Sequence, residues 1–439
     1  MLARSVKKIV TMPLPKIIVI AGTTGVGKSQ LSIELATRYN GEIINSDAMQ
    51  VYKDAPIITN KHPMDERNGI PHHIINYVDW DQEYDIHRFE TDTNVIIEDI
   101  LKRGKLPIIV GGTHYYLQFL FDKYISTGEL DTSNRQISSE EQKLLDNGDK
   151  FEIFEQLRKI DPVIASRYHP NDTKRVHRLL EIYYTTGQKP SDLFAKQEKK
   201  LRYDILFLWL YSDPTELNKR LDSRVDDMVK SGALEEIKQL YNYYKTQQNP
   251  NDHGGIWQVI GFKEFLPWLK SGQQDCKLWN EGVERMKLHT RQYARRQVKW
   301  IQKMLIPDIN GDIYVLDATD LSQWHQLAGE RAARIADLFL HNSPNNNKAK
   351  AELTPRAPKE LLPLISTEQT VGKKRGTSED DCKHFTCDIC RDQNNVKLIA
   401  IGVKQWETHL KSRRHKGNLT RGNKKAAYEK WKAQQEESA

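Results

Sequence analysis

The chain has 439 residues, enough for two or three domains that each bury a core. Its hydrophobic content of 38%, its mean hydropathy of −0.69 and the absence of an apolar run approaching the roughly 18 residues of a membrane span exclude an integral membrane protein and predict no membrane partner. The formal net charge of +7 is compatible with a polyanionic partner, and four cysteines are too few for a disulfide framework, so we expect a reducing compartment.

Residues 1–15 form an N-terminal extension that is basic and lacks acidic side chains, with a second methionine at Met12. This pattern is typical of a weak mitochondrial presequence followed by an internal start, and equally of a frayed basic end. We expect a cytoplasmic protein with mitochondrial and nuclear pools. Translation from Met1 is expected to supply the mitochondrial pool, and the basic run at 373–375 is a weak nuclear signal.

Strands and helices alternate through residues 16–123 and 201–340. Short apolar runs typical of buried strands occur at 16–21, 42–45, 106–112 and 204–210, with helical stretches between them. This alternation predicts the α/β class, with a P-loop NTPase-like parallel sheet. In such a sheet the ligand binds at the carboxyl ends of the strands.

Three regions interrupt or follow this core. Residues 124–200 are polar and helical without a comparable strand, so we predict a helical insertion domain. Residues 341–380 contain four prolines among Asn, Lys and Ser, a composition that predicts a disordered linker. Residues 381–439 hold three of the four cysteines and a basic tail.

The stretch GTTGVGKS, residues 22–29, has the P-loop spacing G-x-x-x-x-G-K-S between a predicted strand and a predicted helix. Glycines let backbone N–H groups converge on phosphate oxygens, Lys28 supplies a cation, and the Ser29 hydroxyl can ligate Mg²⁺. The motif predicts a bound phosphate chain without identifying the molecule that carries it. Its predicted binding residues are Gly22, Thr23, Thr24, Gly25, Gly27, Lys28 and Ser29.

Two further strand ends bear on the same site. The run at 42–45 is followed by Ser46-Asp47, which places the Asp47 carboxylate where a parallel strand delivers it. From the residues alone, this carboxylate is either catalytic or a helix N-cap. The run at 106–110 is followed by Gly111-Gly112-Thr113, where an NTPase often has an aspartate that organises Mg²⁺.

Cys387-x₂-Cys390, eighteen residues, and His409-x₅-His415 form a zinc-finger pattern. Two thiolates and two imidazoles make a tetrahedral donor set suited to Zn²⁺. The span between the pairs exceeds the roughly 12 residues of DNA-reading fingers. A finger that contacts RNA and a purely structural finger both remain compatible with this pattern.

Several motifs resemble the tRNA dimethylallyltransferases, and most of all the eukaryotic members with a C-terminal zinc finger. They occur in order across about 16–305: GTTGVGKS, NSDAMQVYK, GGTHYYLQ, HPNDTKRVHRLLEIYYTTGQKPS, RLDSRVDDMVKSGALEEI, IGFKEF and TRQYARRQVKW. The finger at 383–418 adds to the resemblance. The resemblance implies transfer of a dimethylallyl group from dimethylallyl diphosphate to the exocyclic N6 amine of adenosine 37 in tRNA, 3′-adjacent to the anticodon. The P-loop would then hold a diphosphate.

The resemblance also implies roles for individual residues. Asp47 would accept the proton of the amine, and Arg224 would bind the diphosphate beside Lys28 and a Mg²⁺ held with Ser29. The hydroxyls of Thr23 and Thr113 would contact the substrates. Without the resemblance, the preferred interpretation of Arg224 is a salt bridge with Asp226, Asp227 or another helix. With it, we expect residues 124–200 to bind tRNA. The expected tRNA-binding residues are Gln50, Lys174, Arg175, Arg178, Arg291, Gln292, Arg295, Lys299, Arg413 and Arg414.

Two other functions would account for part of this sequence. A nucleotide or nucleoside kinase would share the P-loop, but it offers no reason for a zinc finger or a basic tail. A non-catalytic RNA-binding protein with a decayed P-loop conflicts with the presence of Lys28, Ser29, Asp47 and Arg224. We expect a monomer that binds the tRNA anticodon stem-loop and dimethylallyl diphosphate, with Mg²⁺ on the diphosphate and a structural Zn²⁺. The adenosine is expected to enter a channel between the core and residues 124–200.

Overall fold

The computed structural model describes residues 13–121, 135–196, 200–247, 254–310, 312–341, 355–365, 379–391 and 396–437. The chain divides into two compact units: unit 1, residues 1–123 and 199–370, and unit 2, residues 124–198 and 371–439. Residues 1–12 of the predicted N-terminal extension, Met12 included, lie outside the described residues. Among the residues that are described, no helix has the length and apolarity needed to cross a membrane.

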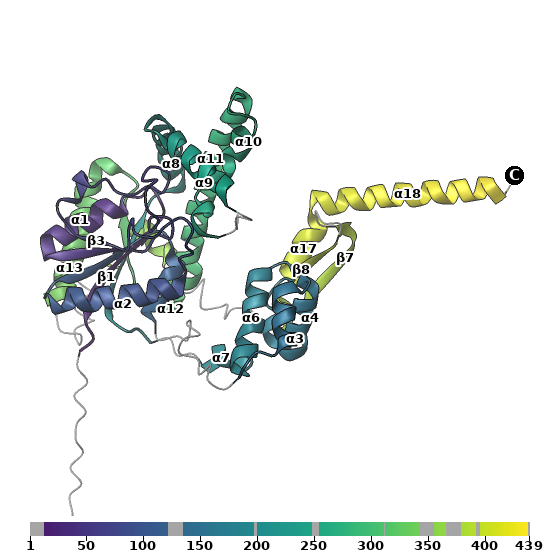
Figure 1. The fold of residues 1–439 in the computed structure, drawn as a ribbon, viewed down its shortest axis with the longest axis horizontal. Coiled ribbons are helices and arrows are strands. Elements are labelled where there is room, and N and C mark those ends of the chain that lie inside the picture. Colours follow the sequence, from purple (N-terminus) through teal and green to yellow (C-terminus); the bar gives the residue numbers. More distant parts are fainter. Residues whose placement is uncertain are drawn as a thin grey trace, which may run out of the picture. The chain divides into compact units, whose positions relative to one another are not determined.

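Unit 1 is built on a six-stranded parallel sheet, which confirms the α/β class (Figure 1). The strand order is β3-β2-β4-β1-β5-β6. Its strands are β1 Lys16–Gly22, β2 Gly41–Asn45, β3 His72–His73, β4 Leu106–Val110, β5 Asp204–Tyr211 and β6 Tyr314–Asp317. The four apolar runs form β1, β2, β4 and β5, whereas the two edge strands β3 and β6 are too short to give a sequence pattern.

β1 lies between β4 and β5, with Ile18 paired to Ile108 on one side and to Leu206 on the other. A central strand covered on both faces must be apolar throughout, which explains the run Ile17–Ala21. Helices α1 Lys28–Tyr39 and α13 Glu330–His341 pack on the sheet through one cluster that contains Ile18, Leu31 and Ala336. Helix α2 Ile86–Lys102 packs against β4 outside this cluster.

The P-loop connects the end of β1 to the start of α1. Gly27 caps α1 with φ 96°, and a Cβ at this position would lie 2.6 Å from the Trp324 ring. The Trp324 indole is fixed because its N–H donates to Glu34 Oε1 at 2.9 Å. Only glycine fits this turn, which aims the first N–H groups of α1 at the carboxyl end of the sheet.

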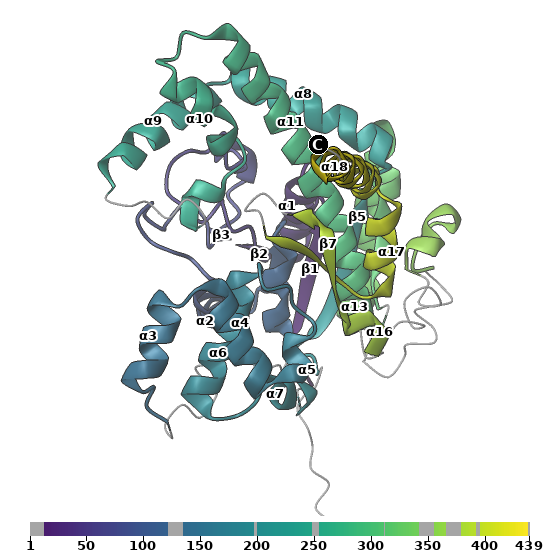
Figure 2. The same cartoon turned by 90° about the vertical axis from the view of Figure 1, so that its right-hand side faces the viewer.

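A helical layer follows β5 in unit 1 (Figure 2). Its longer helices are α8 Pro214–Lys230, α9 Ala233–Thr246, α10 Phe262–Lys270 and α11 Cys276–Trp300. Helices α8 and α11 pack through Leu217, Leu221 and Ala294, and α10 packs on both α9 and α11. The shorter helical turns of unit 1 are η1 Asp65–Arg67, η2 His114–Leu120, η4 Gly255–Gln258, η5 Ile301–Leu305, α12 Ile306–Asp308, η6 Leu321–Gln323, η7 His325–Gly329 and η8 Lys359–Leu364.

Part of the predicted linker has a defined structure. In residues 355–365, the carbonyl of Arg356 accepts the Val315 N–H of the edge strand β6 at 2.7 Å, and Ala357 is 1% exposed. The prediction of disorder is wrong for this segment. Its structure rests on one hydrogen bond to the edge strand and one buried alanine, and neither produces a periodic pattern in the sequence. Residues 342–354 and 366–378 lie outside the part that the structure describes.

Unit 2 contains the helical insertion and the C-terminal segment. The insertion comprises α3 Ser139–Asn147, α4 Lys150–Ile160, α5 Pro162–Ala165, α6 Thr173–Thr186 and α7 Pro190–Lys196, packed around Phe154, Leu157 and Leu180. The C-terminal segment comprises α16 Glu379–Cys382, the antiparallel strands β7 His384–Arg391 and β8 Lys397–Ile401, α17 Val403–Lys411 and α18 Arg413–Glu437.

The two parts of unit 2 are in contact. His384 Nε2 lies 3.0 Å from the carbonyl oxygen of Ser166, and the His384 ring stacks on Phe154 with ring centroids 5.9 Å apart. Phe154 also belongs to the core of the insertion. The C-terminal segment therefore rests on the helical insertion, a contact that the sequence did not predict.

Candidate active site

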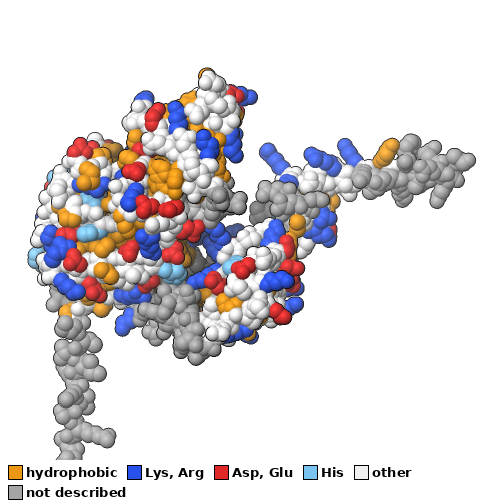
Figure 3. Space-filling view, in the orientation of Figure 1, with side chains coloured by type: hydrophobic (Ala, Val, Ile, Leu, Met, Phe, Trp, Pro, Cys, Tyr) orange, Lys and Arg blue, Asp and Glu red, His pale blue; other side chains and the backbone are white. Residues whose placement is uncertain are grey.

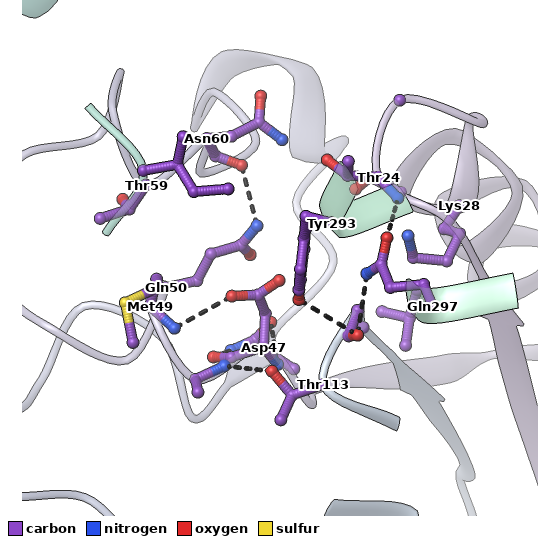
Figure 4. A pocket seen from close by; sticks show the side chains of 18 of the residues that line it. Thr24, Lys28, Asp47, Met49, Gln50, Thr59, Asn60, Thr113, Tyr293 and Gln297 are labelled. Carbon is purple, nitrogen blue, oxygen red and sulfur yellow. Dashed lines mark hydrogen bonds between the residues drawn. The ribbon is translucent and has the colours of Figure 1, made fainter. Parts of the chain in front are cut away.

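A cavity of about 810 Å³ lies at the carboxyl ends of β1, β2 and β4. Its polar side includes the P-loop, the segment 47–50 and the loop Gly111–Thr113 (Figure 4). Its apolar lining includes Leu221, Val225, Met228, Val259, Ile260 and Met286. All the described lining residues belong to unit 1, and helices α8 and α11 contribute the apolar part of the wall together with residues 259–260.

Lys28 lies inside the P-loop, where its Nζ donates to the Thr23 carbonyl at 2.6 Å. Burial lowers the pKa of Lys28 to about 8; the nearby Asp47 carboxylate opposes this shift and Arg224 adds to it. Burial removes the water that would stabilise the charged ammonium. An anionic ligand replaces that stabilisation, so the protonated form of Lys28 favours binding of an anion.

Arg224 reaches the same loop from α8, and its Nη1 donates to Thr24 Oγ1 at 3.3 Å. Burial lowers its pKa, and the charge of Asp47 opposes the shift. The alternative partners are engaged elsewhere, because Asp226 pairs with Lys287 at 2.7 Å and Asp227 with Lys230 at 3.7 Å. Arg224 therefore joins the phosphate-binding loop, and its pairing with those aspartates is not observed.

Asp47 follows β2 and uses its two carboxylate oxygens differently. Oδ1 accepts the Met49 N–H at 3.0 Å and so caps a turn; no described helix begins at this point, so the helix N-cap interpretation is wrong. Oδ2 lies near Gly112 and accepts no hydrogen bond from a residue that the structure describes. The turn is held from β4 as well, because Thr113 Oγ1 accepts the Ala48 N–H at 2.9 Å. One oxygen thus fixes the turn and the other remains available to a ligand.

The hydroxyl residues of the P-loop differ in whether they line the cavity. Thr23 is 3% exposed, does not line the cavity, and its Oγ1 has no hydrogen-bond partner among the residues in the described ranges. Thr24 lines the cavity and holds Arg224. Ser29 also lines the cavity, next to Lys28. Of the P-loop hydroxyl residues, Thr24 and Ser29 therefore line the cavity, and Thr113 of the loop after β4 lines it as well.

The predicted tRNA-binding residues fall in both units. Gln50 lines the cavity and donates to the Asn60 carbonyl at 2.9 Å. On α11, Arg295 and Lys299 are exposed, Gln292 is half-buried, and Arg291 pairs with Asp222 of α8.

Unit 2 holds the other predicted tRNA-binding residues. Arg175 pairs with Asp172 at 2.8 Å and Arg178 with Glu181 at 2.7 Å, while Lys174 is exposed on the same helix, α6. Arg413 and Arg414 begin α18, whose described part carries further Lys and Arg side chains (Figure 3).

Three site residues were missed by the sequence analysis. His114 is 3% exposed, and its Nε2 accepts the Gly22 N–H at 3.2 Å. Burial, with a smaller effect of Lys28, lowers the pKa of His114 to about 3, so the ring is neutral. Tyr293 and Gln297 lie four residues apart on α11 and both contact the carbonyl of Gly112. Helical spacing could have indicated this pair, but on this helix only Arg291, Gln292, Arg295 and Lys299 were predicted to have a role.

The four predicted metal ligands of unit 2 converge. The side-chain donor atoms of Cys387, Cys390, His409 and His415 all lie within 4.8 Å of one another. His415 Nδ1 is 3.5 Å from Cys387 Sγ and 3.2 Å from His409 Nε2. Tetrahedral Zn²⁺ with bonds of about 2.0 to 2.3 Å requires such separations. The Cys390 N–H also points at Cys387 Sγ at 3.3 Å, a contact that favours a thiolate.

Comparison with known proteins agrees with this geometry. The IPP transferase family model matches residues 50–304. The tRNA dimethylallyltransferase of Saccharomyces cerevisiae is 56% identical over 96% of both chains, and that of Schizosaccharomyces pombe is 35% identical over 94% of this chain and 97% of its own. A crystal structure of a eukaryotic dimethylallyltransferase acting on tRNA superposes with a TM-score of 0.85 at 56% identity, covering 95% of this chain and all of that one. The chain belongs to the IPP transferase family.

Proposed function

We propose that the chain transfers a dimethylallyl group from dimethylallyl diphosphate to the N6 amine of adenosine 37, next to the anticodon of tRNA. The observation that carries this proposal is a single cavity that contains a P-loop, a buried arginine and a strand-end carboxylate. Family membership and the names of the relatives support tRNA as the acceptor.

The donor side of the cavity is cationic. Lys28, Arg224 and the N–H groups at the start of α1 surround the space where a diphosphate would lie. These groups stabilise the negative charge that the diphosphate gathers as its bond to the allylic carbon breaks. The P-loop thus holds a leaving group, and the apolar residues of α8 and α11 offer the dimethylallyl chain an apolar surface.

The acceptor side contains the free oxygen of Asp47. The lone pair of the adenine amine is delocalised into the ring, so removal of an N–H proton assists bond formation. In the proposed step the N6–C1 bond forms, the C1–O bond breaks with its electron pair going to the diphosphate, and the N6 proton goes to Asp47 Oδ2. A stacked base could not reach this atom, so the adenosine must leave the anticodon loop.

The cavity has room for both substrates. Its volume of about 810 Å³ lies in the upper part of the range of roughly 300 to 1,000 Å³ typical of ligand sites. Oxygen donors for Mg²⁺ are also present: the Ser29 hydroxyl lines the cavity and makes no hydrogen bond to another described residue. We propose that Ser29 holds a Mg²⁺ whose charge further stabilises the diphosphate.

The experiment that tests the function is incubation of the purified protein with an anticodon stem-loop RNA and either labelled dimethylallyl diphosphate or γ-labelled ATP. We expect label in the RNA only from dimethylallyl diphosphate. Phosphoryl transfer from ATP would favour the kinase alternative, and equal reaction with free adenosine would favour a nucleotide-level prenyltransferase.

Oligomeric state and localisation are separate proposals. We propose a monomer, which light scattering of the purified protein would test. We also propose cytoplasmic, mitochondrial and nuclear pools that depend on the start codon. Tagged chains forced to begin at Met1 or Met12 should differ in their mitochondrial fraction, and identical distributions would contradict a targeting role for the extension.

A further inference from the structure

Gln297 of α11 connects two loops of the active site. Its Oε1 accepts the Thr24 N–H of the P-loop at 2.8 Å, and its Nε2 donates to the Gly112 carbonyl at 2.8 Å (Figure 4). The side chain is 3% exposed, so water does not compete for either bond. Gln297 thus contacts both the P-loop and the loop after β4.

The loop after β4 in turn sets the position of Asp47. The Thr113 N–H donates to the Ser46 carbonyl at 3.1 Å, and Thr113 Oγ1 accepts the Ala48 N–H at 2.9 Å. These two bonds hold the residues on either side of Asp47. A path of hydrogen bonds therefore leads from the P-loop through Gln297 and the Gly112–Thr113 loop to the carboxylate.

The packing around Gly112 shows how closely these groups meet. A Cβ on Gly112 would lie 2.5 Å from Gln297 Nε2, 3.1 Å from Asp47 Oδ2 and 3.4 Å from the Tyr293 hydroxyl. Tyr293 supports the same carbonyl, because its hydroxyl donates to the Gly112 oxygen at 3.3 Å. Gln297, Gly112 and the free oxygen of Asp47 are thus immediate neighbours.

An amide side chain suits this position because it offers one acceptor and one donor at a fixed separation. A glutamate would lack the N–H for the Gly112 carbonyl. An asparagine is one methylene shorter, so it could reach one loop and not both. A methionine has a similar length and makes neither bond.

We propose that Gln297 is a positioning residue that sets the distance between the diphosphate on the P-loop and the base at Asp47. This inference rests on the proposed function and adds a residue to which it assigned no role. Gln297 acts through the two loops, so each substrate can still bind when it is replaced. The allylic carbon of the donor and the N6 nitrogen of the adenosine are then misplaced relative to each other. A misplacement of about 1 Å is enough to slow a reaction about 10²-fold.

The test measures single-turnover rates and equilibrium affinities of the full-length protein with dimethylallyl diphosphate and an anticodon stem-loop RNA. For Gln297→Met we expect a rate about 10- to 100-fold below wild type at saturating substrates. Both dissociation constants should stay within about threefold of wild type, because neither hydrogen bond contacts a substrate. Gln239→Met, at an exposed position on α9, is the matched control and should retain the wild-type rate.

A double-mutant cycle separates positioning from a general loss of structure. If Gln297 acts by placing Asp47 against the donor, Gln297→Met should slow an Asp47→Asn enzyme by less than about threefold, because the positioned base is already absent. A purely structural defect would slow both backgrounds equally. If Gln297→Met does not fold, as judged by circular dichroism and thermal unfolding, Gln297→Asn provides the same comparison with the amide retained.

The outcomes distinguish this inference from the proposed function. A wild-type protein that transfers no dimethylallyl group to RNA would overturn both. An active wild type together with a Gln297→Met variant within threefold of its rate would overturn the positioning role alone. Additive effects in the cycle, or donor affinity that falls as much as the rate, would also overturn it.

Discussion

One carboxylate oxygen of Asp47 accepts the Met49 N–H at 3.0 Å, and the other oxygen is left facing Gly112. One oxygen of this aspartate thus caps the turn that follows β2, and the other is the oxygen to which we assign the role of base. Substitutions can separate them, because an asparagine retains an oxygen that can cap the turn.

We predict that Asp47→Asn folds as well as wild type and binds both substrates. Its single-turnover rate should fall by about 10² to 10⁴, the usual contribution of a general base. Asp47→Ala should also lose the hydrogen bond that caps the turn, and lower the free energy of unfolding by about 1 kcal/mol. Rapid-quench kinetics and denaturant titration measure the two effects. An asparagine variant within a few-fold of the wild-type rate would leave Asp47 with the capping role alone.

The lowered pKa of Lys28 predicts a pH dependence of donor binding. Below a pH of about 8 the Lys28 ammonium is present and attracts the diphosphate. Above this pH the neutral amine must take up a proton on binding, so the dissociation constant should rise with pH, approaching tenfold per pH unit between about 8.5 and 10. Calorimetry in buffers of different ionisation enthalpy should show proton uptake at pH 9.

Lys28→Met is the control for this dependence. It should bind the diphosphate more weakly at pH 7 and lose the rise of the dissociation constant above pH 8. A wild-type dissociation constant that is flat from pH 7 to 9.5 would mean that Lys28 stays protonated in the empty site, contrary to the prediction.

Gly112→Ala tests the crowding at the centre of the site. The new methyl group would lie 2.5 Å from Gln297 Nε2, so the amide must move and at least one of its bonds must break. We expect a rate loss similar to that of Gln297→Met. Gly104→Ala is a suitable comparison for a glycine substitution without crowding, since nothing lies within 4 Å of a Cβ there, although its φ of +68° adds backbone strain. Full activity of Gly112→Ala would contradict the close packing.

Loss of zinc should destabilise the helical insertion as well as the finger. Chelation, or Cys387→Ser, should unfold the C-terminal segment, because a finger this small cannot bury a core of its own. The contact of His384 with Ser166 and Phe154 would then be lost. Hydrogen exchange should therefore increase in α4 and α5 as well as in β7 and β8. For the reaction, the KM for tRNA should rise far more than kcat falls.

A His384→Ala variant isolates the contact from the metal site. It should keep the metal content of wild type and show the faster exchange of α4 and α5 alone. Unchanged exchange in those helices after chelation would mean that the insertion does not depend on the finger.

The sequence predicted the elements that are encoded locally. The four long strands appear as apolar runs because each is buried on both faces, and the P-loop and the four metal ligands are fixed by spacing. Asp47 could be placed at a strand end for the same reason. Each of these features depends on residues that are close in the chain.

The features that were missed depend on tertiary contacts. Gln297 lies 273 residues from Thr24 and 185 from Gly112, and its helical spacing from Tyr293 does not show which loops it contacts. His114 was part of a quoted motif, but its role depends on a Gly22 N–H that only the sheet brings close. The wall formed by α8 and α11 was missed likewise, because periodicity shows that a helix has an apolar side without showing what it covers.

The segment after α13 has a consequence for the solubility of shortened forms of the protein. Arg356 occupies the outer edge of β6 through one backbone hydrogen bond and pairs with Asp312, and Ala357 is buried beside it. A chain that stops at residue 341 would leave the N–H of Val315 open at the rim of the sheet. Unprotected strand edges pair with one another, so a truncated catalytic core should self-associate where a chain ending at residue 365 stays dispersed.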